Sequence, residues 1–174
     1  MNHDGNGDPR PILLVDVDGV LNPWEAEEIP DGYAEFGFFP GERVLLSPGH
    51  GRLLTELATD YELVWATAWE HNANRLICPV LELPELPVIE FPLSGRDLFF
   101  RKLPSVIEAV GDRPCAWIDD VHLPDHYEWA ANRVTPTLLI DINPAEGFTA
   151  ATAQQLAAWA AGLREPEGQP DDSA

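Results

Sequence analysis

The stretch that decides the fold is ILLVDVDGVLNP, residues 12–23. It begins with four apolar residues and then places two carboxylates, Asp16 and Asp18, one residue apart, with Gly19 directly after them. A continuous apolar run is typical of a buried strand in a parallel sheet, and open α/β sheets bind ligands at the carboxyl ends of such strands. The stretch therefore predicts a strand over residues 11–16 that carries two acids to a ligand-binding edge.

Two other interpretations fit a segment of the form Asp-x-Asp-Gly. Aspartate and glycine are common in turns, so the two acids also fit a simple turn. A calcium-binding loop starts in the same way, but its pattern D-x-[DN]-x-[DN]-G requires an acid or an amide where this chain has Val20. The calcium loop is therefore disfavoured, and the turn stays open until the other motifs are considered.

The composition of the 174-residue chain, with 45% hydrophobic residues, fits one domain with a hydrophobic core. No stretch approaches the roughly 18 apolar residues of a membrane span, and the first residues lack a signal-peptide pattern. We therefore expect a cytoplasmic protein without membrane contact. Cys78 and Cys115 form no C-x-x-C motif and lie among apolar residues, which favours buried free thiols.

The charge is strongly negative, because 30 acidic residues against 10 basic ones give a formal net charge of −20. Such a charge repels polyanions and disfavours nucleic acid as a partner. Residues 1–10 are polar, and residues 165–174 are acidic and contain Pro, Gly and Ser. Both ends are expected to be disordered, around a single domain over residues 11–164.

Strand and helix patterns alternate along this domain, which predicts an α/β fold: a Rossmann-like, doubly wound parallel sheet with helices on both faces. After the first strand, residues 22–46 are rich in aromatic residues and too long for a simple βα loop, which predicts a small flap insert. Further strands are expected at residues 62–67, 88–91, 115–118 and 138–142. Helices are expected from Pro48 through Leu57, at 73–83 with an interruption at Pro79, at 103–110 and at 149–163.

A second predicted strand also ends in paired acids, Asp119 and Asp120. If the strands over residues 11–16 and 115–118 are neighbours where the strand order reverses, their four carboxylates share one crevice. Carboxylates this close need a cation, and Mg²⁺ binds carboxylate, water and phosphate oxygens. Alone, the second pair of acids also fits a helix N-cap before Leu123, but its pairing with the first acids weakens that alternative.

Two further positions add groups that suit phosphate oxygens. The strand over residues 62–67 ends in Thr67, whose hydroxyl and nearby backbone N–H groups reach the same predicted edge. Lys102 is the only lysine of the chain, and it lies at the start of the helix before the second acidic strand. A compact point charge suits an acidic crevice, although chance placement fits each of these residues as well.

In this order the residues resemble the four motifs of the haloacid dehalogenase-like (HAD) superfamily of phosphohydrolases. The segment Asp16-Val17-Asp18-Gly19-Val20-Leu21 is similar to the first motif, Thr67 to the second, Lys102 to the third and Asp119-Asp120 to the fourth. The resemblance covers residues 11–143. More narrowly, DVDGVLNP followed by TAWEHNAN resembles the phosphatase-type HAD domain found in RNA-repair proteins.

The resemblance implies a phosphatase that hydrolyses phosphate monoesters through an aspartyl-phosphate intermediate. Asp16 is then the nucleophile and Asp18 the general acid and base, while Thr67 and Lys102 bind the transferring phosphoryl group. The cofactor that the resemblance implies is Mg²⁺. The implied metal ligands are Asp16, the backbone carbonyl of Asp18, and a fourth-motif acid, for which we favour Asp120 with Asp119 close by.

The substrate is expected to contact the second-motif segment and the lysine, so the predicted binding residues are Thr67, Ala68, Trp69, His71 and Lys102. Packing and helix capping account equally well for Trp69 and His71. The 34 residues between Thr67 and Lys102 leave no room for a large cap domain, which makes the domain essentially capless. The crevice is therefore expected to be open, and to accept a phosphorylated small molecule or a phosphorylated macromolecular end.

Three alternatives remain on the sequence alone. The first is a non-catalytic or regulatory binding module that keeps the fold, which the presence of all the motif acids disfavours. The second is a phosphatase partner domain that acts on nucleic-acid ends, which the net charge opposes unless Arg75, Arg96 and Arg101 cluster at the mouth. The third, phosphotransfer of the mutase kind, ranks last because such proteins usually carry a substantial cap.

Overall fold

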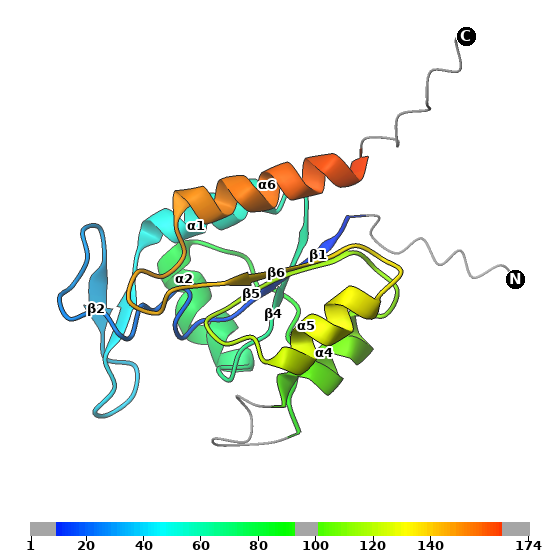
Figure 1. Cartoon of the computed structure of the whole chain (residues 1–174). Helices are drawn as coiled ribbons and strands as arrows, with labels where there is room; N and C mark the ends of the chain where they lie inside the picture. The colour runs from blue at the N-terminus through cyan, green and yellow to red at the C-terminus, as the bar shows by residue number, and fades with distance from the viewer. Residues whose placement is uncertain (1–9, 93–100, 165–174) are drawn as a thin grey trace, which may run out of the picture.

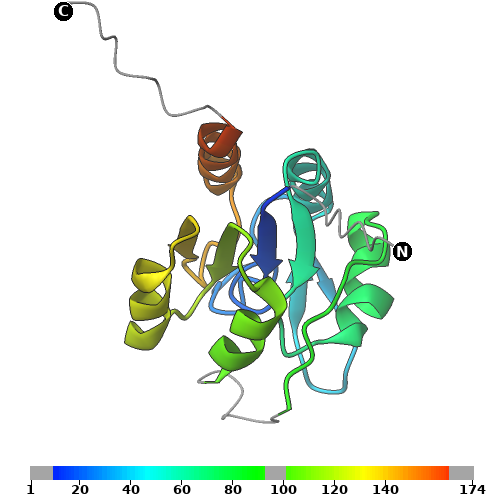
Figure 2. The ribbon, with the colours of Figure 1, turned by 90° about the vertical axis from the view of Figure 1, so that its right-hand side faces the viewer.

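The computed structural model describes residues 10–92 and 101–164, so the expectations for residues 1–9 and 165–174 and for Arg96 lie outside the described residues. A parallel sheet forms the middle layer, and α-helices cover it on both faces (Figures 1 and 2). This arrangement confirms the predicted α/β, Rossmann-like fold class. Within the described residues, no helix is long and apolar enough to cross a membrane.

The sheet has the strand order β4-β1-β5-β6, and every neighbouring pair is parallel. Its strands are β1 (Ile12–Val15), β4 (Glu62–Trp65), β5 (Cys115–Asp119) and β6 (Thr137–Asp141). Val15, at the end of β1, pairs with Trp65 on one side and with Ile118 on the other. Because these three strands end level, the residues that follow them meet at one edge of the sheet.

Helices pair up on the two faces of this sheet (Figure 2). One face carries α1 (Pro48–Leu57) and α6 (Ala150–Arg164), and the other carries α4 (Lys102–Val110) and α5 (Pro124–Asn132). Ser47 caps α1 as predicted, since its Oγ accepts a hydrogen bond from the Gly49 backbone N–H. The predicted start of the third helix is confirmed within one residue, and it places Lys102 in the first turn of α4.

The helix expected at residues 73–83 is a π-helical turn, η1 (Ala73–Ile77), followed by the short helix α2 (Cys78–Leu81). Pro79 lies in the first turn of α2, where the N–H that proline lacks has no helical partner. The helical type changes between Ile77 and Cys78, so the interruption predicted at Pro79 lies just before that proline. Cys78 and Cys115 are both buried and free, as expected.

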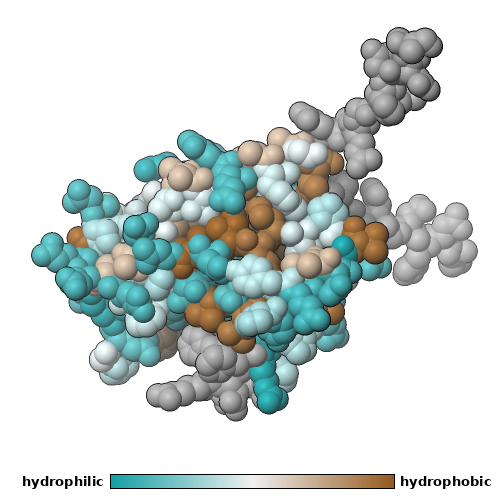
Figure 3. Space-filling model, in the orientation of Figure 1, coloured by the Kyte–Doolittle hydropathy of each residue, from teal (hydrophilic) through white to brown (hydrophobic). Residues whose placement is uncertain are grey.

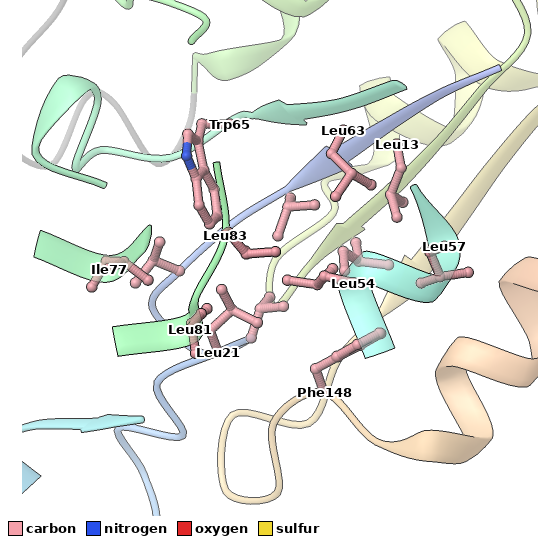
Figure 4. Close-up of a cluster of buried hydrophobic side chains, with 14 of the residues drawn as sticks. Leu13, Leu21, Leu54, Leu57, Leu63, Trp65, Ile77, Leu81, Leu83 and Phe148 are labelled. Atoms are coloured by element: carbon pink, nitrogen blue, oxygen red, sulfur yellow. The ribbon is translucent and has the colours of Figure 1, made fainter. Parts of the chain in front are cut away.

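Each face of the sheet has its own apolar cluster, because alternate residues of a strand point to opposite faces. Leu13 and Val15 pack toward α1 and α6, and Figure 4 draws part of this cluster, with Leu13, Leu54, Leu57 and Phe148 among its labelled residues. Ile12 and Leu14 pack on the opposite face with residues of α4. A fully buried side chain of this size contributes about 1.5–3 kcal/mol, so the packing holds β1 firmly from both sides.

In two segments the observed strands differ from those predicted from the sequence. Residues 22–46 contain an antiparallel hairpin of β2 (Ala34–Phe36) and β3 (Val44–Leu46), where an irregular flap was expected. The strand predicted over residues 88–91 is reduced to a single bridge between Val88 and Trp65. Prolines at positions 87 and 92 lack the N–H groups that a longer ladder needs, which explains the loss.

Helix α5 is a third difference, since no helix was predicted after the fourth motif. Only His126 among its residues is buried, so the apolar periodicity that marks a helix in sequence is missing. The N-cap of α5 is Leu123, and neither acid of the fourth motif caps it.

On the face shown in Figure 3, apolar side chains gather where β6 lies between α5 and α6, and the surface over the hairpin is mostly polar.

Candidate active site

Asp16 is the first residue after β1, and only 3% of it is exposed. Its Oδ1 accepts a hydrogen bond from the Val17 backbone N–H at 2.7 Å, and its Oδ2 accepts one from Lys102 Nζ at 2.7 Å. The hydroxyl of Thr67, two residues beyond β4, lies close enough to this carboxylate to lower its pKa. The structure thus brings three of the predicted catalytic residues together below the edge of the sheet.

Lys102 serves a second carboxylate, because its Nζ also donates to Asp119 Oδ2 at 2.8 Å. All three charged side chains are buried. Burial lowers the pKa of Lys102, but the carboxylates of Asp16 and Asp119 outweigh it and raise that pKa overall. Burial also raises the pKa of Asp16, to about 6, against the opposing effect of the ammonium group. The lysine therefore stays charged at neutral pH and compensates two buried acids.

Asp18 faces a crevice next to this cluster. Its Oδ1 accepts from Asn22 Nδ2 at 2.8 Å, and its Oδ2 accepts from Trp69 Nε1 at 2.9 Å. Asn22 is itself fixed, because its Oδ1 accepts from the Leu45 backbone N–H of β3 at 2.8 Å. Burial raises the pKa of Asp18, and the bonds from Asn22 and Trp69 act in the opposite direction. A carboxyl group with a raised pKa holds a proton more readily, which suits an acid–base role.

Gly19 makes the turn after Asp18 possible. Its φ is +77°, a left-handed conformation that L side chains rarely adopt. A Cβ atom at this position would lie 2.3 Å from the carboxylate of Asp120, far inside van der Waals contact. The loop after β1 therefore approaches the fourth-motif acid as closely as a backbone can.

A cluster of three carboxylates lies between β1 and β5. Asp16, Asp119 and Asp120 offer oxygen atoms that all lie within 4.8 Å of one another. Such a set fits Mg²⁺, which takes carboxylate oxygens and completes its shell with water and phosphate. The Asp119 carboxylate already accepts from Lys102, Trp117 and the Val121 backbone N–H. Asp120 is the member of the pair that faces the crevice.

The carboxylate of Asp18 is not part of this three-acid cluster. Its two oxygens accept from Asn22 and Trp69 instead. The resemblance assigned the backbone carbonyl of Asp18, and not its side chain, to the metal, and that assignment stays a prediction. The structure thus separates the Asp18 carboxylate, held by Asn22 and Trp69, from the three acids that could hold a cation.

Trp117 of β5 supports this cluster from the far side. Its Nε1 donates to Asp119 Oδ2 at 3.2 Å. Its ring is stacked on His126 at 4.9 Å between centroids and meets the edge of His122 at 5.0 Å. No sequence pattern distinguishes Trp117 from any other apolar residue of a buried strand, so its contact with the acids was missed.

The crevice beside Asp18 has a volume of about 690 Å³. Six of its described lining residues are Asp18, Trp24, Phe39, Ala68, Trp69 and Asp120. Ala68 and Trp69 thus lie where a bound substrate was expected. Asp16, Thr67 and Lys102 are buried beneath it and are not among the described residues that line it.

His71 does not lie at the crevice, although a substrate contact was predicted for it. It is exposed, and its Nε2 lies 2.8 Å from Glu90 Oε1, on the outer side of the segment after β4. Trp69 points toward Asp18, whereas Glu70, with a left-handed φ of +46°, turns the chain between Trp69 and His71.

Binding of a polyanion would require Arg75, Arg96 and Arg101 to cluster at the mouth of the crevice. Arg75 and Arg101 are not among the described residues that line it. Arg75 is exposed and donates to Asn72 Oδ1 at 2.8 Å. The arginine that lines the crevice is Arg43, at the end of the hairpin loop before β3. Its Nε donates to Glu35 at 3.1 Å and its guanidinium also donates to the Ala26 carbonyl at 3.0 Å. The charge of Arg43 is therefore already partly compensated by a carboxylate.

Comparison with curated proteins and with solved structures gives no match. A family described as the HAD domain in Swiss Army Knife RNA repair proteins matches residues 12–153. The match runs from β1 into α6 and includes every residue of the cluster and of the second and third motifs. By this match over most of its length, the chain belongs to the family of HAD domains in Swiss Army Knife RNA repair proteins.

Proposed function

We propose that the protein is a Mg²⁺-dependent phosphatase that hydrolyses phosphate monoesters through an aspartyl-phosphate intermediate on Asp16. The observation that carries this proposal is the placement of the buried Asp16 carboxylate, which lies 2.7 Å from Lys102 Nζ and within 4.8 Å of two further acids. Membership of a HAD family supports a phosphohydrolase-type function. The crevice beside Asp18 supplies a place for the rest of the substrate.

In the first step, an oxygen of Asp16 forms a bond to phosphorus while the bond between phosphorus and the leaving-group oxygen breaks. The electron pair of the broken bond stays on the leaving oxygen, and the carboxyl group of Asp18 donates its own proton to that oxygen. Asn22 and Trp69 hold the Asp18 carboxyl group in place for this transfer. Lys102 and Thr67 bind the phosphoryl oxygens as negative charge develops on them.

In the second step, a water molecule attacks phosphorus and the bond to Asp16 breaks, which releases inorganic phosphate and restores the aspartate. Asp18, now ionised, takes a proton from the attacking water and so returns to its starting state. One difficult displacement is thereby divided into two easier ones, with the same residue as acid and then as base.

Asp16, Asp120 and the backbone carbonyl of Asp18 would hold Mg²⁺. When bound, the cation offsets negative charge on the phosphoryl group and on the acids around it. Lys102 offsets part of this charge on its own, since it bonds to both Asp16 and Asp119. Asp119 would act chiefly by positioning that ammonium group.

A phosphatase domain that acts on phosphorylated nucleic-acid ends is the second candidate. The description of its family as a domain of RNA repair proteins favours this reading. The net charge of −20 opposes it, because a polyanion is repelled at low and moderate salt.

Release of inorganic phosphate tests the proposal, with an activated aryl phosphate, small phosphate monoesters and 3′- or 5′-phosphorylated oligonucleotides as substrates. We expect wild-type turnover that needs Mg²⁺ and is lost in Asp16→Asn. Asp125→Asn, which removes an exposed acid on α5, serves as the control and keeps wild-type turnover. No release from any substrate, or an Asp16→Asn protein as active as wild type, would contradict the proposal.

A further inference from the structure

Two tryptophans flank the two acids that face the crevice. Trp69 Nε1 donates to Asp18 at 2.9 Å, and Trp24 Nε1 donates to Asp120 at 3.3 Å. Both rings line the crevice. Each indole N–H is thus directed at a carboxylate, and the two rings mark out the space in front of the proposed acid–base and metal-binding residues.

The two tryptophans differ in how they are held. Trp69 is 8% exposed and is backed by Phe38 and Phe39, with ring centroids at 6.1 and 5.5 Å. Trp24 is 54% exposed, the larger part of a big apolar ring left in water. Val121, beside Trp24's partner acid, is also exposed and lines the same crevice. The crevice therefore contains one rigidly packed indole, that of Trp69, and one solvent-exposed indole, that of Trp24. A ligand that packs on the exposed ring would remove its apolar surface from water.

The charge of the crevice is negative. Asp18, Asp120 and Glu42 are acidic members of its described lining, and the basic one, Arg43, already donates to Glu35 at 3.1 Å. Bound Mg²⁺ would offset Asp120 itself, but Arg43 is already partly compensated and the chain carries a net charge of −20, so the crevice still disfavours a group that brings further phosphates.

We propose that the crevice binds the leaving group of the substrate, as a planar aromatic ring without a further phosphate that stacks on Trp24. This inference rests on the proposed function, because the acid role of Asp18 is what places the leaving oxygen at the crevice. The volume of about 690 Å³ is enough for a group the size of a nucleoside. Trp24 is then the residue that gives preference for a flat ring over a saturated one.

Binding of a matched pair of phosphonates tests this inference without any turnover. The pair is 2-naphthylmethyl phosphonate and its fully hydrogenated analogue, which share the phosphonate and the carbon skeleton and differ in planarity. Titration calorimetry with Mg²⁺ present measures both dissociation constants. We expect the naphthyl compound to bind wild type about 10-fold more tightly, as stacking on an aromatic side chain predicts.

Variants of Trp24 separate the ring from its N–H group. Trp24→Phe keeps a ring and loses the bond to Asp120, and we expect it to keep most of the preference for the planar compound. Trp24→Leu keeps apolar bulk, and we expect the preference to fall below about 3-fold. Trp159→Leu is the control, because Trp159 stacks on Tyr61 at 6.3 Å and belongs to α6. Loss of the preference in this control, or its full retention in Trp24→Leu, would overturn the inference.

A second comparison distinguishes a free ring-bearing ester from the terminal unit of a strand. Adenosine 5′-monophosphate is compared with a short oligonucleotide that carries the same terminal 5′-phosphorylated nucleotide, at low salt with Mg²⁺, on the Asp16→Asn variant so that neither is consumed. The acidic lining predicts tighter binding of the mononucleotide. Tighter binding of the oligonucleotide would overturn the charge part of the inference.

The failure of this inference and that of the proposed function can be told apart. Equal binding of the two phosphonates, in a protein that still releases phosphate through Asp16, overturns the planar-ring inference alone. A protein that prefers the naphthyl compound but hydrolyses no monoester has the aromatic site and lacks the proposed activity.

Discussion

Lys102 forms an ion pair with Asp16 at 2.7 Å, and the two side chains are 3% and 5% exposed. The pair joins the first turn of α4 to the residue that follows β1, 86 positions apart in sequence. Removing charges from water is costly unless they are well paired. The pair therefore ties the stability of the domain to the residue proposed as its nucleophile.

Lys102→Met should lower the free energy of unfolding by roughly 3–5 kcal/mol, because it leaves the acids Asp16 and Asp119 buried without their cation. Urea denaturation measures the change. The matched control is Arg164→Met, which breaks a pair with Asp60 at 2.6 Å in which the arginine is 59% exposed. An exposed pair is worth at most about 1 kcal/mol. Equal losses in both variants would show that burial does not set the value of the Lys102 pair.

Asp120→Asn should weaken Mg²⁺ binding by at least about 10-fold, or about 1.4 kcal/mol, because a neutral amide replaces the acid that faces the crevice. Calorimetric titration with Mg²⁺ in the absence of substrate measures this directly. Asp125→Asn again serves as the control and should bind as wild type does. Unchanged affinity in Asp120→Asn would remove that residue from the ligand set and leave Asp119 as the fourth-motif ligand.

Gly19→Ala and Gly41→Ala separate backbone strain from crowding at the site. Both glycines have a left-handed φ, +77° and +81°, but a Cβ on Gly41 would meet nothing within 4 Å. Gly41→Ala should cost about 1–2 kcal/mol of stability from its backbone conformation alone. Gly19→Ala should cost a further 1–3 kcal/mol or so through overpacking, and should weaken Mg²⁺ binding by displacing Asp120. Equal effects on stability, with no effect on metal affinity, would contradict the close approach of Gly19 to that carboxylate.

Part of the fold and site was predictable because it depends on local patterns. The apolar run before Asp16 and the one before Asp119 each predict a buried strand, and parallel strands bring their ends to one edge whatever the connections between them. The order of helices and strands then limited which strands were neighbours. Asp16, Thr67, Lys102 and Asp119 are accordingly found together.

What the sequence did not predict depends on contacts between distant segments. Asn22 is hydrogen-bonded to the Asp18 carboxylate and to the Leu45 backbone N–H, and the residues next to it in sequence do not distinguish it from an ordinary loop residue. Trp24 lies in the aromatic-rich stretch over residues 22–46, and no sequence pattern distinguishes it from the other aromatic residues there. Helix α5 has a single buried residue, so its amphipathic pattern is too weak to detect. His71 follows Glu70, whose left-handed φ of +46° turns the chain, and no sequence pattern around this glutamate indicates that conformation.

His50 makes stability depend on pH below neutrality. Burial lowers the pKa of His50 from 6.5 to about 4, and the ring lies between Tyr33 and Phe148. Below pH 6.5 the His50 side chain takes up a proton in the unfolded chain but stays neutral in the folded protein. The contribution of His50 to the free energy of unfolding is therefore complete above pH 6.5 and is lost as the pH falls toward 4. Between pH 7 and pH 5 the loss is about 2 kcal/mol.

His50→Gln removes this titration and keeps a polar side chain near Tyr33. The free energy of unfolding of wild type should therefore fall by about 2 kcal/mol more than that of the variant between pH 7 and pH 5. Other titrating groups contribute equally to both proteins and cancel in the comparison. Parallel pH profiles for the two proteins would show that His50 is not kept neutral by the fold.

The most direct test of the account is to trap the phosphoryl group on Asp16 in the Asp18→Asn variant. An activated aryl phosphate needs no proton to leave, so this variant should still allow transfer to Asp16 while failing to activate the water that clears it; such a loss is typically 10²–10⁴-fold. We predict a burst of about one phenolate per active site, and an acid-quenched protein about 80 Da heavier, with the added mass mapping to the peptide that contains Asp16. A protein that turns over with no trapped phosphate, or with phosphate on a peptide that lacks Asp16, would contradict the account.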